Sequence, residues 1–181
     1  MLKAFAKSLK SVDVDVQSTG ATALSKLMLS QLIVDVDLLK NLVIAFFDPE
    51  TSANAQMRQG LTYFLPVYCH SRAANAERMA TVATGVISRV ATIREAFIED
   101  EDADDGEMVT LSVVGGHLVD WTDPRKIVGN DNDAATFLKS NPQDDTAGSA
   151  QADMIHFVLA EQILEKLVTS QTSSKSIHST T

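Results

Sequence analysis

Apolar residues recur at helical spacing along almost the whole chain, and no long stretch alternates apolar and polar residues. The pattern predicts a short helix over residues 2–10, a second after the cap candidates Ser18 and Thr19, and a third from Asp35 or Asp37 to residue 47. The third is apolar nearly all round, so we expect it to be buried between neighbours. One face of the second is predicted to carry Leu24, Leu27, Met28 and Leu32.

The dipeptide Asp48-Pro49 ends the third helix, and the next is predicted to begin near Thr51 or Ser52. Pro66 lies within this fourth helix and predicts a kink, because it removes one backbone donor and clashes with the preceding turn. Its buried face is predicted to consist of Met57, Leu61, Phe64, Leu65 and Tyr68.

The clearest helix is predicted over residues 72–94, and another over residues 107–121, before a turn at Asp123-Pro124. The buried stripe of the first is predicted to be Met79, Val82, Ala83, Val86, Ile87, Val90 and Ile93. A weak short helix is predicted over residues 134–140. A final helix over about residues 151–168 is apolar on most faces.

These elements predict an all-α fold, a HEAT/armadillo-type helical-repeat solenoid segment, because helices of ten to twenty residues follow one another in antiparallel pairs. A closed helical bundle predicts the same periodicity and stays open as an alternative. We expect Phe46–Phe47 to pack against Phe64–Leu65. The other predicted core aromatics are Trp121, Tyr63 and Tyr68.

The predicted organisation places helical repeats over residues 1–140, with an acidic loop at residues 95–106. A linker rich in Asn, Asp, Gly and Ser follows at residues 141–150. The final helix is assigned to residues 151–169, and the Ser/Thr-rich tail at residues 170–181 is expected to be disordered.

The composition is that of a globular protein, with 45% hydrophobic and 22% charged residues among 181. No run reaches the roughly 20 apolar residues of a membrane span, so no membrane partner is expected. Lys3, Lys7 and Lys10 interrupt the first apolar residues, which argues against a signal peptide. Cys69 is the only cysteine, so no intrachain disulfide can form, and an intracellular, reducing compartment is expected.

The net charge of −9 argues at first against a nucleic-acid partner, but the acidity is local. Eight acidic residues with no base among them lie between Glu95 and Glu107. Without them, 16 of the 24 acidic residues remain against 15 Lys and Arg. The rest of the chain is therefore close to neutral and leaves room for a local basic face.

One stretch, residues 46–79, reads FFDPETSANAQMRQGLTYFLPVYCHSRAANAERM. It resembles the carboxy-terminal HEAT region of the condensin G-type subunit family (condensin complex subunit 3). The resemblance rests on a helix with an Arg-Gln, a Leu, an aromatic pair and a Pro-x-Tyr, followed by a turn, an Asn and another helix. The matching residues are Arg58-Gln59, Leu61, Phe64, Pro66, Tyr68 and Asn75.

The sequence departs from the family pattern at Gly60, which weakens its helix by about 1 kcal/mol relative to Ala. The acidic loop is also longer than expected. Family members are much longer proteins, so the chain resembles a fragment, an isolated domain or a truncated product. As part of a solenoid, it is expected to associate or aggregate through its apolar end helices.

The resemblance implies a non-catalytic subunit that binds the kleisin chain of condensin and helps grip DNA during mitotic chromosome condensation. It implies a location in the nucleus and on chromosomes, with the cytoplasm for part of the cell cycle. The alternative function is a protein-only HEAT-repeat adaptor without a nucleic-acid role. A contiguous basic groove would favour the first, and an acidic or apolar concave face the second.

Four arginines are candidates for contact with DNA phosphates: Arg58, Arg72, Arg78 and Arg89. Arg78 and Arg89 are eleven residues apart and lie within about 20° on one helix face. Hydroxyl side chains of the same helix lie beside them, and guanidinium and hydroxyl groups commonly bind phosphates. The plainer interpretation is a solvated helix face with salt bridges, such as Arg78 beside Glu77.

No residue pattern indicates catalysis, a metal or a cofactor. Asp100, Asp102 and Asp104 suggest a calcium loop, but its glycine falls one place late and its twelfth position is Leu111. Adjacent residues on a helix do not face each other, so Cys69-His70 is not a catalytic pair.

Three further positions are interpreted as structural. His117 and His156 are expected to be satisfied or exposed within apolar helices. Gly115-Gly116 lacks a phosphate-loop context and is expected to permit close helix packing.

Overall fold

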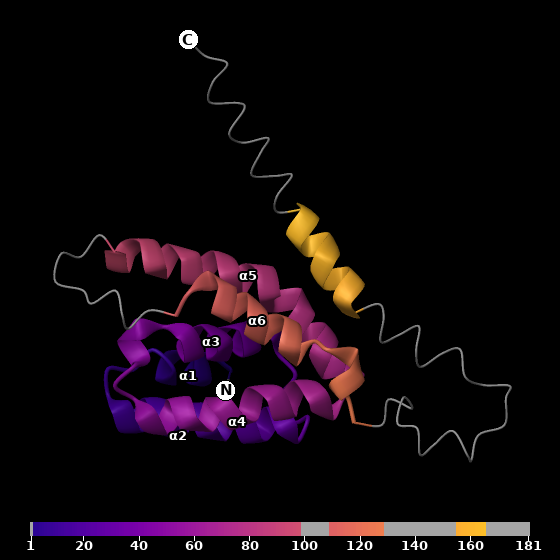
Figure 1. The fold of residues 1–181 in the computed structure, drawn as a ribbon. Coiled ribbons are helices and arrows are strands. Elements are labelled where there is room, and N and C mark those ends of the chain that lie inside the picture. The colour runs from indigo at the N-terminus through magenta and orange to yellow at the C-terminus, as the bar shows by residue number, and fades with distance from the viewer. Residues whose placement is uncertain (1, 99–108, 129–154, 166–181) are drawn as a thin grey trace, which may run out of the picture.

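The computed structural model describes residues 2–98, 109–128 and 155–165, and within these ranges the chain forms helices and no strand (Figure 1). The labelled helices are α1 (Leu2–Ser8), α2 (Val14–Leu29), α3 (Val36–Phe47), α4 (Ala55–Ser71), α5 (Ala73–Ile98) and α6 (Leu111–Trp121). Two short 3-10 turns are η1 (Pro49–Thr51) and η3 (Pro124–Lys126). One more helix covers residues 155–165.

The second helix begins earlier than the sequence pattern predicts. Its N-cap is Asp13, whose side chain accepts hydrogen bonds from the backbone amides of Asp15 and Val16. Ser18, a predicted cap, lies one turn inside the helix, where its buried hydroxyl shares its single proton between the carbonyl of Val14 and the side-chain oxygen of Asn54. The predicted face is confirmed at Leu24 and Met28, whereas Leu32 follows the helix end and is exposed.

The third helix starts where one of the two predicted caps stands, because the Asp35 carboxylate accepts from the backbone amide of Leu38 at 2.8 Å. Its end at Asp48-Pro49 is also as predicted. The fourth helix starts later than predicted, because the Asp48 side chain caps the turn η1 and Asn54 then caps α4. The residues predicted to begin the fourth helix therefore lie in or directly after the turn η1.

Most helices that are neighbours along the chain pack together, as α4 does with α5 and α5 with α6. Helices two apart in sequence also lie side by side, α2 against α4 and α3 against α5, so α2 and α4 run together below α3 and α5 in Figure 1. This layering is typical of stacked helical repeats and settles the choice that periodicity left open between a solenoid and a closed bundle.

The core combines the apolar faces predicted for α3, α4 and α5 with apolar side chains of α2, α6 and the helix at residues 155–165. In α5 the predicted stripe is confirmed: Met79, Val82, Ala83, Val86 and Val90 are buried, and Ile87 and Ile93 are half-buried. The largest side chain that is fully buried in the described ranges is Tyr68, in α4.

The aromatic residues of α3 and α4 make ring contacts within the core. Phe47 stacks on Trp121 of α6 at 6.0 Å between ring centroids, and Phe64 lies 5.4 Å from Tyr68. Phe47, Phe64 and Leu65 are buried in one core and Phe46 is half-buried against it, so the predicted burial of the two pairs is confirmed. Tyr63, a predicted core residue, is 68% exposed because it lies on the outer face of α4.

The longest helix, α5, extends four residues beyond its predicted end at residue 94. The acidic loop therefore does not begin at Glu95, because that residue continues the helix in a stretch without Gly or Pro. The prediction that Gly115-Gly116 permits close helix packing is also wrong, because a Cβ added at either position would meet nothing within 4 Å.

Several predictions fall outside the described residues: most of the acidic loop, the weak helix at residues 134–140, the linker and the tail. Of the final helix, residues 155–165 are described. Ile155 and Leu159 are buried, and the Thr84 hydroxyl of α5 donates to the Gln162 side chain at 3.2 Å. Its outer side exposes Phe157 and Leu164.

Candidate functional site

Arg58, the first predicted phosphate contact, is used inside the fold. Its guanidinium donates to the carbonyl of Asp48, at the end of α3, and to the hydroxyl of Thr51. Burial lowers the pKa of Arg58, and the nearby Asp48 carboxylate partly opposes that shift. The side chain is half-buried, so it serves to hold the α3–α4 turn.

Arg78 takes part in a junction around Asn75, which is fully buried at the start of α5. The Asn75 amide group donates to the carbonyl of Tyr68 at 2.9 Å, and its oxygen accepts from the Arg78 guanidinium at 2.6 Å. That oxygen also accepts from Gln31, in the α2–α3 turn, at 3.4 Å. Asn75, a residue of the resemblance, thus joins two interhelical turns, and Arg78 stabilises that junction.

The junction also affects Tyr68. Burial raises the pKa of the Tyr68 hydroxyl, and the Arg78 guanidinium beside it partly lowers it. The hydroxyl makes no hydrogen bond with any described residue, so proximity to Arg78 is its main polar contact. Arg78 is consequently half-buried and only partly available to a ligand.

Arg72 and Arg89 are exposed, and neither side chain has a hydrogen-bond or ion-pair partner in the ranges that the structure describes. Arg72 caps α4 with extended backbone, and its carbonyl accepts from Asn75 and Ala76 to start α5. It lies seventeen positions before Arg89 in the sequence. Of the four predicted arginines, these two are therefore free to contact a ligand.

Sequence reasoning missed a cation that lies between these positions. Lys40 of α3 is half-buried, and a Cβ added at Gly85 of α5 would lie 2.9 Å from its Nζ. The ammonium group thus sits over α5, one helical turn before Arg89. The available signal was the polar pair Lys40-Asn41 within the mostly apolar run of the third helix.

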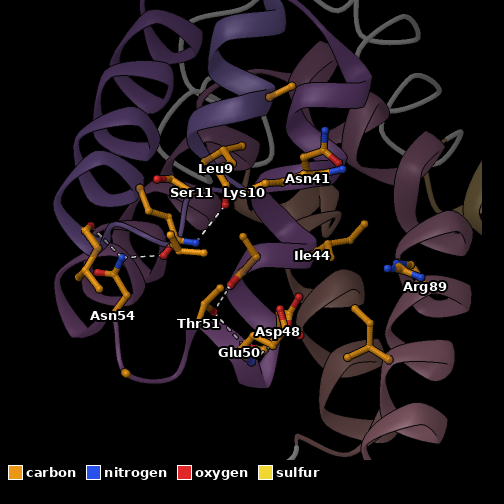
Figure 2. Close-up of a pocket in the computed structure, with 17 residues that line it drawn as sticks. Leu9, Lys10, Ser11, Asn41, Ile44, Asp48, Glu50, Thr51, Asn54 and Arg89 are labelled. Atoms are coloured by element: carbon orange, nitrogen blue, oxygen red, sulfur yellow. Dashed lines mark hydrogen bonds between the residues drawn. The ribbon is translucent and has the colours of Figure 1, made fainter.

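Arg89 lines a cleft of about 600 Å³, bounded by the end of α1, by α3 and η1, and by α5 (Figure 2). Its apolar lining includes Leu9, Ile44 and Ile93. Figure 2 shows Lys10 and Asn41 toward one end, Asp48 and Glu50 toward the other, and Arg89 on a side wall. Opposite charges therefore mark the two ends.

The inner polar wall of the cleft is already satisfied. The Asn54 amide donates to Gln17 at 2.8 Å and to the carbonyl of Val14 at 3.2 Å. Its oxygen accepts from the Met57 amide and from the Ser18 hydroxyl. These four bonds exhaust the side chain, so this wall is structural.

The mouth of the cleft is different. The side chains of Lys10, Asn41, Glu50 and Arg89 make no hydrogen bond or ion pair with other described residues. Asn41 is half-buried although its side chain has no such partner. Unused donors and acceptors at a concave surface are groups that a ligand can satisfy.

The cysteine and histidine candidates are not arranged for catalysis. Cys69 is fully buried, and burial strongly raises the pKa of its thiol. His70 instead places Nε2 3.1 Å from the carbonyl oxygen of Asp120. His117 is exposed on α6, with its ring 5.2 Å from that of Trp121. One ring nitrogen of His156 is buried without a partner among the described residues.

Metal and membrane sites are absent from the parts of the chain that the structure describes. There, no three His, Cys, Asp or Glu side chains gather in a way that would bind a metal ion. No helix in those parts has the length and apolarity needed to cross a membrane. The calcium-like aspartates lie outside them.

Comparison with known proteins gives one consistent result. The family described as "Nuclear condensing complex subunits, C-term domain" matches residues 1–180. Condensin complex subunit 3 of Saccharomyces cerevisiae is 31% identical over 131 residues, 70% of this chain and 12% of that protein. Its human counterpart is 27% identical over 173 residues, 96% of this chain and 15% of that protein.

A solved structure agrees with the sequence relatives. A chain of the Schizosaccharomyces pombe condensin Cnd3-Cnd2 subcomplex is 28% identical, with a TM-score of 0.56 over 70% of this chain and 16% of that chain. The similarity therefore extends to the helical-repeat architecture. The present chain spans between 12% and 16% of the length of the curated relatives it matches.

Proposed function

The chain belongs to the family of nuclear condensing complex subunits, and we propose from this premise that it acts as a non-catalytic segment of a condensin-type complex. The observation that carries the proposal is the family match over residues 1–180, supported by a shared helical-repeat fold. We extend it to location: the nucleus and chromosomes, with the cytoplasm for part of the cell cycle.

The first proposed activity is binding of the kleisin subunit. The similar solved structure is a Cnd3-Cnd2 subcomplex, which supports a kleisin-type partner for this chain. The test is co-purification of the 181-residue chain with a kleisin fragment. Retention of the fragment at equal stoichiometry supports the proposal, and complete separation at micromolar concentration contradicts it.

The second proposed activity is weak, sequence-independent contact with DNA phosphates. Of the candidate arginines, Arg72 and Arg89 are exposed, and the half-buried Arg78 of α5 and Lys40 of α3, whose ammonium group lies against α5, add positive charge. Arg58 is the weakest of the original candidates, because its guanidinium already has internal partners. Few phosphates would be neutralised, and the net charge of −9 opposes approach, so affinity is expected to be low.

The DNA proposal is tested by titrating the chain with a duplex from low to physiological salt. Each of Arg72→Ala and Arg89→Ala is expected to reduce the slope of log affinity against log salt by about one unit. Arg125→Ala is the matched control, because that exposed arginine lies outside the site and pairs with Asp123 at 2.8 Å. Identical slopes for all proteins would make a protein-only adaptor the better account.

A further inference from the structure

We propose that the cleft between α1, α3, η1 and α5 binds an extended peptide with an acidic side chain at one end, an apolar one in the middle and a basic one at the other. This inference concerns a site and a ligand pattern, and it holds whether or not the partner is a kleisin and whether or not the chain grips DNA.

The unused polar groups indicate where the charged ends of the peptide would lie. Lys10, Asn41 and Arg89 supply donors for a carboxylate at one end and the side wall. At the other end, Glu50 is free and exposed, and Asp48 is half-buried with one oxygen accepting from the Glu50 amide. A Lys or Arg side chain there would gain a charge-assisted hydrogen bond.

The apolar lining indicates the middle of the ligand. Leu9 is buried, and Ile44 and Ile93 are half-buried along the cleft wall. Its volume of about 600 Å³ lies in the range of natural ligand sites. A short peptide segment can cover this lining with one apolar side chain, which a purely polar ligand cannot do.

The same features favour a peptide over a nucleic acid at this place. A DNA strand carries a negative charge at every phosphate, so its path through the cleft would bring phosphates against Asp48 and Glu50. It would also leave the apolar wall uncovered. Separated charges of both signs match a ligand that itself carries both signs.

The experiment measures fluorescence anisotropy of the 181-residue chain with labelled heptapeptides. The probes carry Glu at one end, Leu at the centre and Arg at the other, in both chain directions, with Ser and Gly between. A control peptide has Gln in place of Glu and Arg. We expect one direction to bind, and Arg89→Gln and Glu50→Lys each to weaken it by about tenfold, the worth of one charge-assisted contact.

The Glu50→Lys variant separates this proposal from the DNA proposal, because its effects have opposite signs. It should weaken the Glu–Leu–Arg peptide and tighten duplex DNA. A peptide with Glu at both ends should bind Glu50→Lys better than the wild type. Arg125→Gln should bind every probe as the wild type does, and circular dichroism should show that all variants keep their helices.

Three results would overturn the proposal: no charged heptapeptide binds better than the Gln control, Glu50→Lys leaves the preferred peptide unchanged, or Arg125→Gln weakens it as much as Arg89→Gln does. Loss of kleisin co-purification with peptide binding intact would instead count against the proposed function alone.

Discussion

The interior of the helical stack and the mouth of the cleft use the same residue types in opposite ways. Inside, every polar atom of the Asn54 side chain is bonded to a neighbouring group. The Arg58 guanidinium donates to the Asp48 carbonyl and the Thr51 hydroxyl through one nitrogen, while its buried Nε has no partner among the described residues. At the mouth, Arg89 and Asn41 have no such partner among the described residues. Residue type therefore does not distinguish a structural polar group from a binding one, but the presence of internal hydrogen-bond partners does.

The largest expected effect comes from removing apolar volume in the interior. Phe64 is buried in α4 against Tyr68, so Phe64→Ala should lower the free energy of unfolding by about 3–5 kcal/mol. Phe64→Leu keeps most of the volume and should cost about 1 kcal/mol. Urea denaturation measures both, and a loss below that of the Leu variant would show that the site is not part of the core.

The next effect tests the satisfied wall of the cleft. Asn54→Ala removes the cap of α4 and leaves buried partners unbonded, so it should cost about 2–4 kcal/mol of unfolding free energy. Asn54→Ser retains a cap acceptor and should recover about 1 kcal/mol of that loss. Equal stability of the two variants would show that the cap contributes nothing.

Much of the fold was predictable because burial imposes a period on the sequence. The stripe of α5 and the apolar surround of α3 follow from it, and the end of α3 at Asp48-Pro49 follows from the proline, which cannot continue a helix. Helix starts were less predictable, since several Asp, Ser and Thr residues are equally good caps. Asp13, and not Ser18, is the N-cap of α2, because the Ser18 side chain faces Asn54 across a helix interface. That contact joins residues far apart in sequence.

The candidate site was less predictable for the same reason. Helical spacing alone placed Arg78 and Arg89 on one face, but their availability depends on residues from other helices. Asn75 and Tyr68 occupy the surroundings of Arg78, while Asn41 and Ile44 only line the cleft beside Arg89. The cleft itself combines three separated segments, and no local pattern marks it.

A smaller change in the free energy of unfolding is expected for an arginine with internal partners, and it distinguishes that arginine from one without partners. Arg58→Ala removes donors from the Asp48 carbonyl and the Thr51 hydroxyl and should cost about 1–2 kcal/mol of unfolding free energy. Arg58→Lys should recover only part, because an ammonium group cannot reproduce the planar fork of donors. Thermal denaturation measures both variants, and a neutral Arg58→Ala would remove the structural role assigned to this residue.

Gly60 and Gly20 allow the same comparison between an exposed position and a packed one to be made for the backbone. Gly60 is exposed in α4, and a Cβ added there would meet only open space, so Gly60→Ala should raise the free energy of unfolding by about 0.5–1 kcal/mol through helix propensity. At Gly20, a Cβ would lie 2.2 Å from the Ser8 hydroxyl, so Gly20→Ala should destabilise the α1–α2 contact. Urea denaturation should give opposite signs, and a shared sign would contradict the packing of α1.

The smallest expected effect is at the mouth of the cleft. Arg89→Ala removes an exposed side chain without partners in the described structure, so unfolding free energy should change by less than about 0.5 kcal/mol. The same holds for Lys10→Ala, which tests the other side of the mouth. Paired denaturation curves with Arg58→Ala give the decisive contrast. If Arg89→Ala cost as much as Arg58→Ala, its guanidinium would be a structural group, and the distinction between a satisfied interior and a ligand-ready mouth would fail there.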